Sequence, residues 1–118
     1  MIDPVTNAYS HAYVLAPDGR TPQPENDSRR WSDSMQDLRA RDAHAVARDS
    51  IAAGLMISTV FMGTDLSSGD GPPQLWETAL FEDAGEGRLG QFVEVLDRYS
   101  SWEAAAAGHA AEVALFNR

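Results

Sequence analysis

The residues of this chain that could do acid–base or ligand chemistry are one histidine near the C-terminus and a few carboxylates. His109 lies in an apolar helical pattern, next to Gly108. Combined with Glu77 or Asp65, it could serve as a general base or as a ligand to a bound group. One imidazole defines a reaction only when a positioned partner fixes its role, and no spacing here supplies that partner. His109 is therefore a candidate ligand-binding residue, with a structural position at the margin of the core as the alternative.

Motifs for metal binding and for nucleophilic catalysis are missing from the sequence. The chain has 118 residues, no cysteine and three histidines, which excludes zinc–thiolate sites and cysteine nucleophiles. The histidines do not form an HxH or HExxH pattern, and no DxDxDG loop occurs. We therefore predict no metal, no cofactor and no catalytic residue, and we expect a protein that is not an enzyme.

Negative charge gathers in the second half of the chain. The net charge is −9; residues 1–59 carry eight acids and six arginines, whereas residues 60–118 carry ten acids and three arginines. This balance argues against nucleic-acid and anionic-membrane binding, which need clustered cations. It favours a protein partner with a basic surface, and a merely solvated acidic surface is the alternative. The candidate partner-binding residues are Asp65, Asp70, Glu77, Glu82, Asp83 and Glu86.

The segment 63–74 is predicted to be an exposed loop that joins two strands. It holds glycines, serines, Asp65, Asp70 and the pair Pro72–Pro73, and it has no lysine, arginine or histidine. A phosphate-binding loop would be followed by a helix N-terminus, whereas a strand pattern follows here. The loop is longer than most hairpin connections, and long loops are often functional.

The elements that must position these residues are predicted from periodicity. A short strand at 12–15 is followed by a turn at Pro17–Arg20 and an irregular edge at 21–24. A helix begins near Asp27 or Ser28 and carries an apolar stripe of Trp31, Met35 and Leu38. Strands are then expected at 44–51, 55–62, 75–81 and 91–96, with a polar loop over 82–90.

The last helix is predicted from a capping signal and an apolar seam. Ser100 and Glu103 have the spacing of a capping box. The seam that follows consists of Trp102, Ala106, His109, Val113 and Phe116. We expect one α+β domain over residues 1–118, with residues 1–8 as a loose tail. Its antiparallel sheet has about four to five strands, and the C-terminal helix of its two helices packs on one face.

Three segments together resemble a group of small, mostly uncharacterised proteins encoded by bacteriophages and prophages. They are STVFMGTD at 58–65, GPPQLWET at 71–78, and YSSWE at 99–103 followed by GHA at 108–110. The resemblance covers about residues 43–114. Members of the group often have histidine directly after the aspartate, where this chain has Leu66, so no metal or catalytic role carries over to Asp65. The resemblance implies a phage or mobile-element context and no assigned activity.

Two classes of function remain from the sequence. The first is a non-enzymatic accessory protein that binds a host or defence-system protein through its acidic surface, such as an inhibitor of the anti-CRISPR kind. The second is a small ligand- or metal-binding module or enzyme that uses His109 with Glu77 or Asp65; a minor virion protein is a further alternative. The sequence has no apolar stretch long enough to cross a membrane, and we expect a protein of the host cytoplasm without membrane contact.

Overall fold

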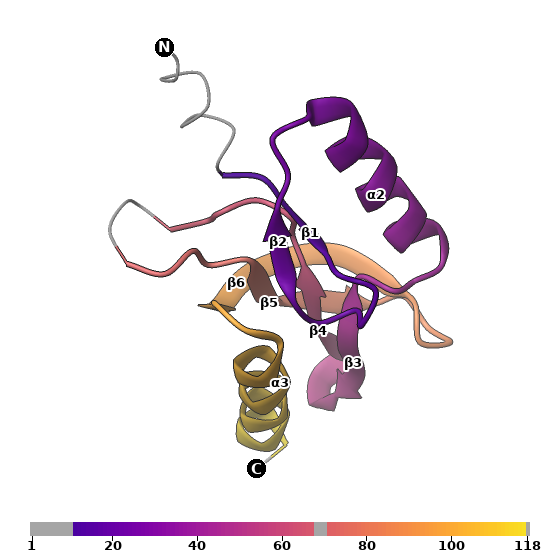
Figure 1. Cartoon of the computed structure of the whole chain (residues 1–118). Coiled ribbons are helices and arrows are strands. Elements are labelled where there is room, and N and C mark those ends of the chain that lie inside the picture. The colour runs from indigo at the N-terminus through magenta and orange to yellow at the C-terminus, as the bar shows by residue number, and fades with distance from the viewer. Residues whose placement is uncertain (1–10, 68–70, 118) are drawn as a thin grey trace.

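The computed structural model describes residues 11–67 and 71–117, and it has two antiparallel sheets and two helices (Figure 1). The expected loose tail at 1–8 lies outside the described residues. The elements, in chain order, are β1 (Tyr13–Leu15), β2 (Pro22–Pro24), α2 (Ser28–Ala40), β3 (Ala45–Ile51), the short 3₁₀ turn η1 (Ala52–Gly54), β4 (Leu55–Phe61), β5 (Trp76–Asp83), β6 (Leu89–Tyr99) and α3 (Trp102–Phe116). The predicted α+β class is confirmed.

The larger sheet has the strand order β3-β4-β5-β6, and every neighbouring pair is antiparallel. Strand β4 lies inside the sheet, as its β-branched residues and apolar content suggest. The register opposes Thr59 to Thr78 and Ser58 to Ala79. Neighbouring side chains on a strand point to opposite faces, so these two pairs lie on different sides of the sheet.

Strand β6 is longer than predicted because it contains extra residues relative to β5. The predicted strand at 91–96 extends in the structure over Leu89–Tyr99. Its pairing with β5 shifts register three times, so that Ala79 opposes Val95 while Phe81 opposes Phe92. Such bulges increase the local twist and re-aim side chains.

Helix α3 covers one face of the larger sheet and contacts all four of its strands. His109 of α3 bonds to Thr59 of β4, which identifies the face of Thr59 and Thr78 as the covered face. We call the opposite side, to which Ser58 and Ala79 point, the open face. The middle of this face is nevertheless closely packed, because Met56, Ser58 and Ala79 are buried.

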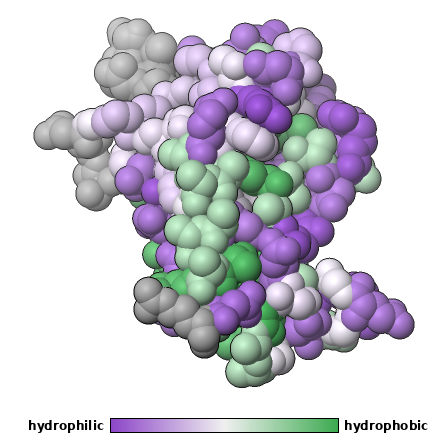
Figure 2. Space-filling view, turned by 90° about the horizontal axis from the view of Figure 1, so that it is seen from below, coloured by the Kyte–Doolittle hydropathy of each residue, from purple (hydrophilic) through white to green (hydrophobic). Residues whose placement is uncertain are grey.

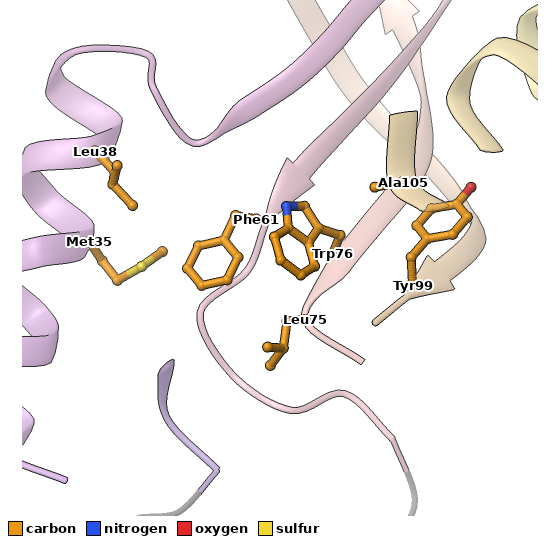
Figure 3. Close-up of a cluster of buried hydrophobic side chains, with 7 residues drawn as sticks. All are labelled: Met35, Leu38, Phe61, Leu75, Trp76, Tyr99 and Ala105. Atoms are coloured by element: carbon orange, nitrogen blue, oxygen red, sulfur yellow. The ribbon is translucent and has the colours of Figure 1, made fainter. Parts of the chain in front are cut away.

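Helix α2 and the β1–β2 hairpin form the other end of the molecule. Asp27 caps α2 by accepting from the amides of Arg29 and Arg30, as the sequence predicts. Met35 and Leu38 of α2 are buried against the sheet, and the cluster they join is drawn in Figure 3. The side chains in this cluster are Met35, Leu38, Phe61, Leu75, Trp76, Tyr99 and Ala105. The rings of Phe61 and Trp76 lie 5.1 Å apart at its centre.

The start of α3 differs from the expectation by one residue. Ser101, not Ser100, is the N-cap, and its hydroxyl accepts from the amide of Ala104. Of the predicted seam only His109 is buried, and the other buried residue of α3 is Ala105, which the predicted seam does not include. The remaining seam positions are partly exposed.

The N-terminal hairpin and the C-terminal helix touch. The guanidinium carbon of Arg20, in the turn between β1 and β2, lies 3.7 Å from the centre of the Trp102 ring. A cation over an indole face is a favourable contact. The smaller sheet is thereby joined to the first turn of α3.

Candidate functional site

A chain of polar side chains runs through the covered face of the sheet and ends on α3. The Nε2 atom of His109 lies 2.7 Å from Oδ2 of Asp49, and its Nδ1 atom lies 2.8 Å from the hydroxyl of Thr59. Thr59 bonds in turn to the hydroxyl of Thr78, and Thr78 donates to the hydroxyl of Tyr99 at 3.0 Å. These five residues come from β3, β4, β5, β6 and α3, so the polar chain joins every strand of the larger sheet to the helix.

Asp49 is a residue of the polar chain that the sequence did not predict as a site residue. It is half-exposed at the end of β3, and the pairing that places it beside His109 depends on how α3 crosses the sheet. The alternative function drawn from the sequence combines His109 with Glu77 or Asp65, whereas the structure pairs His109 with Asp49. The strand pattern at 44–51 contains Asp49 but offers no signal that its carboxylate meets a helix residue.

The far end of the polar chain is held by close packing between Tyr99 and Gly108. A Cβ atom at Gly108 would overlap the ring and hydroxyl of Tyr99, so only glycine fits at this position of α3. Burial raises the pKa of Tyr99, and the nearby carboxylates of Asp97 and Glu112 raise it further, against the opposing effect of its bond with Thr78. Tyr99 is therefore held in its neutral, hydrogen-bonding form.

An aspartate, a histidine and a threonine hydroxyl in a row have the order of groups found in activated nucleophiles. The geometry here does not serve that chemistry. Thr59 is completely buried, and its hydroxyl is already engaged by Thr78. A substrate carbonyl would have to reach that oxygen, and the described residues enclose no cavity beside it. The polar chain thus satisfies buried groups and fixes α3 on the sheet.

Two of the acids proposed for partner binding have structural partners. Glu77 points to the open face, away from His109, and its Oε2 accepts from Nε of Arg98 at 3.1 Å. Asp65 accepts from the amides of Ser67 and Gln74 and so holds the two ends of its loop together. Burial acts to raise the pKa of Asp65, but the hydrogen bonds from Ser67 and Gln74 outweigh it, and the pKa is lowered.

Three of the other acids proposed for partner binding, Glu82, Asp83 and Glu86, lie at or near the turn between β5 and β6. Glu82 and Glu86 are exposed, whereas Asp83 accepts from the hydroxyl of Ser50 and from the amide of Gly85. Asp70 lies outside the described residues.

Several acids that the sequence did not single out join Glu82 on the covered side of the sheet. Glu94 opposes Leu80, and Asp97 opposes Thr78, so both project on the side where α3 lies. Glu112 projects from α3 near Tyr99. We call the set Glu82, Glu94, Asp97 and Glu112 the acidic side. The described part of the chain provides no ion-pair partner to any of its four members.

Between the acids, the outer surface of α3 is apolar. Figure 2 shows a pale green apolar band crossing the molecule, with hydrophilic surface on both of its flanks. The exposed apolar residues of α3 agree with this band; they are Ala104, Ala107, Ala110, Ala111, Ala114 and Leu115. Alanine is also the strongest helix former, so these residues stabilise α3 whatever else they contact.

The described residues contain neither a metal-binding cluster nor a membrane-spanning helix. Residues 11–67 and 71–117 contain no group of three or more His, Asp or Glu side chains placed to hold a metal ion. No helix in these ranges has the length and hydrophobicity needed to span a bilayer.

Comparisons with known proteins give no relative. The chain matches no protein-family model, no curated protein and no solved structure.

Proposed function

We propose that this chain is a non-enzymatic binding protein that engages a basic surface of a protein partner through its acidic side. The proposal rests on one observation: the carboxylates of the acidic side have no arginine partners in the described residues. Of the ten acids in residues 60–118, Glu77 is paired with an arginine, while the four members of the acidic side have no arginine partner in the described residues.

Unpaired carboxylates on one side of a molecule produce a potential that attracts and orients a cationic partner. The arrangement has a second useful property, which is rigidity. Glu94 and Asp97 project from a strand of the larger sheet, and Glu112 projects from a helix fixed to that sheet by the polar chain. A charge pattern held on strands and a helix is presented without an ordering cost when the partner binds.

The resemblance to phage and prophage proteins suggests the biological role. We propose a phage or mobile-element accessory protein that acts in the cytoplasm of the host cell on a host or defence-system protein, with inhibition of a CRISPR-type complex as the specific form. This part of the proposal rests on the resemblance and the acidic surface together.

The alternative use of His109 with Glu77 or Asp65 finds no support in the geometry. His109 is occupied on both ring nitrogens, and Glu77 lies on the opposite face of the sheet, bound to Arg98. We therefore propose no enzymatic function.

The experiment compares the wild type with two matched charge reversals. Glu94→Arg alters the acidic side, and Asp33→Arg alters the exposed surface of α2 by the same amount of charge. Each tagged protein is used to capture partners from a bacterial host lysate, and bound proteins are identified by mass spectrometry. We expect a partner that the wild type and Asp33→Arg retain at low salt and that Glu94→Arg loses by about 10-fold or more.

Salt provides the second readout. Attraction between exposed charges is screened within about 8–10 Å at physiological ionic strength, so capture should weaken as salt is raised. Equal capture by all three proteins, or no captured protein at low salt, would contradict the proposal.

A further inference from the structure

The open face of the larger sheet carries apolar side chains on β4, β5 and β6, and two of those on β6 are exposed. An antiparallel sheet with one face in water normally alternates apolar and polar residues, so that the wet face is polar. Here the open face is mixed: Met56, Val60, Ala79, Phe81, Phe92 and Val95 share it with Ser50, Ser58 and Asp83 and with the ion-paired residues Arg48, Glu77 and Arg98. A sheet with this pattern is expected to be one layer of a two-layer structure.

The bulges of β6 concentrate apolar side chains on this face. Ala79 and Phe81 are two residues apart on β5 and share the open face, and their partners on β6 are Val95 and Phe92. Val95 and Phe92 are three residues apart and would lie on opposite faces of a regular strand. The extra residue between them brings both to the open face.

Both of these side chains are exposed, as is Val93 between them. Phe92 is 53% exposed and Val95 is 37% exposed, whereas Met56 and Ala79 beside them are buried. The ring of Phe92 meets that of Phe81 edge-on, with centroids 5.7 Å apart. Phe92 is thus packed on one side and open on the other. Phe92 and Val95 together form the open-face patch.

Two of the carboxylates around the patch are paired with arginines, in contrast to the acidic side. Glu77 next to it is paired with Arg98, and Arg48 on β3 is paired with Asp42 at 2.9 Å. Asp83 accepts a hydrogen bond from the hydroxyl of Ser50 and keeps its negative charge. The open face therefore carries little net charge in a protein whose total is −9.

We infer that the open face is a docking surface for a second copy of this chain, with the two open-face patches packed against each other about a two-fold axis. A two-fold interface presents the same surface twice, so it must be self-complementary in shape and charge. The open face meets the charge condition, because its ion pairs are internal and two copies would not repel there. Two acidic sides could not meet in this way without strong repulsion between like charges.

In the dimer the two sheets would lie about 10 Å apart, as in sandwiches of antiparallel sheets. Each copy would bury the exposed parts of Phe92 and Val95, and the acidic side of each would remain on the outside. Because few exposed apolar residues take part, the interface is at the small end of specific interfaces. We expect association with a dissociation constant on the order of 10 µM.

The test is sedimentation equilibrium of the full chain over a range of protein concentrations, on the order of 1 µM to 1 mM so that the expected constant is bracketed. The double variant Phe92→Gln/Val95→Gln replaces the patch with polar, uncharged residues and leaves the net charge at −9. Leu115→Gln is the matched control, because Leu115 is as exposed as Phe92 but lies on α3. Circular dichroism confirms that each variant is folded.

We expect the wild type and Leu115→Gln to dimerise alike, and the double variant to dissociate at least about 10-fold more readily, since both copies lose apolar contact. A wild type that stays monomeric throughout would overturn the inference. So would a dimer that survives the double variant or is lost in Leu115→Gln, the latter assigning the interface to the apolar band of α3. The Glu94→Arg variant tests the proposed function separately, because it leaves the open-face patch unchanged.

Discussion

The two faces of the larger sheet differ in how their buried polar side chains are hydrogen-bonded. The covered face buries hydroxyls and an imidazole, and each is satisfied through the polar chain from Asp49 to Tyr99. The open face buries Ser58 beside Thr59 on the same strand, yet the Ser58 hydroxyl has no partner in the described residues. Two adjacent residues of β4 thus differ: the hydroxyl of Thr59 is hydrogen-bonded, whereas that of Ser58 has no partner in the described residues.

The difference indicates which face determines the fold and which is available for contact. A satisfied buried network fixes one arrangement of helix on sheet, because any other would leave its polar groups unpaired. The open face has no comparable hydrogen-bonded network, so its side chains do not fix the position of another element of the chain. Mutations on the covered face should therefore affect stability, and mutations on the open face should affect association.

The largest effect is expected at His109. Replacing His109→Ala removes a buried ring and leaves the hydroxyl of Thr59 without its partner, which should lower the free energy of unfolding by about 3 kcal/mol. Leu115→Ala on the exposed side of α3 should cost less than about 1 kcal/mol. Urea unfolding followed by circular dichroism measures both. Equal losses would mean that the polar chain does not hold α3 in place.

A smaller and sharper contrast is expected at neighbouring residues of β4. Thr59→Val keeps the shape of the side chain but removes both of its hydrogen bonds, and it should cost about 2 kcal/mol in unfolding free energy. Ser58→Ala removes a hydroxyl that has no protein partner and should change stability by less than about 0.5 kcal/mol, in either direction. If Ser58→Ala proves as costly as Thr59→Val, the two faces do not differ in the way described.

The smallest effect is expected at Tyr99 and depends on pH. Its pKa is raised above the ordinary value of 10.0, chiefly by burial, so the folded state favours the neutral phenol. The stability that this provides is present below pH 10.0 and is lost as the pH rises through the folded pKa. Unfolding by denaturant, repeated at increasing alkaline pH, should show a steeper loss of stability for the wild type than for Tyr99→Phe. Parallel loss in both proteins would assign the alkaline sensitivity to other groups.

Local patterns were sufficient to predict the elements of this fold. The stripe of Trp31, Met35 and Leu38 identified α2, and the β-branched run at 55–62 identified β4. These signals depend on residues close together in the chain, which fix each element before the others are placed. The one-residue error at Ser100 arose because two adjacent serines both offer a capping hydroxyl.

The site could not be predicted in the same way, because it depends on contacts between distant elements. Asp49 meets His109 only when α3 crosses β3, and no spacing in the sequence records that crossing. The bulges of β6 were missed for a related reason. An alternating pattern assigns Phe92 and Val95 to opposite faces, and their common side follows only from the pairing with β5. The sequence shows that acids are concentrated in the second half of the chain. It does not show that the unpaired acids lie on the covered side of the sheet while the open face carries ion pairs.

The contact between Arg20 and Trp102 has a consequence for how the protein is made. Translation delivers the hairpin of β1 and β2 well before the indole ring against which its turn packs, because Trp102 lies about 80 residues later in the chain than Arg20. The hairpin has few strand residues of its own, and a two-stranded pair is marginally stable by itself. Nascent chains that stop before residue 102 should therefore expose the hairpin to proteases and chaperones, and chains that include α3 should protect it.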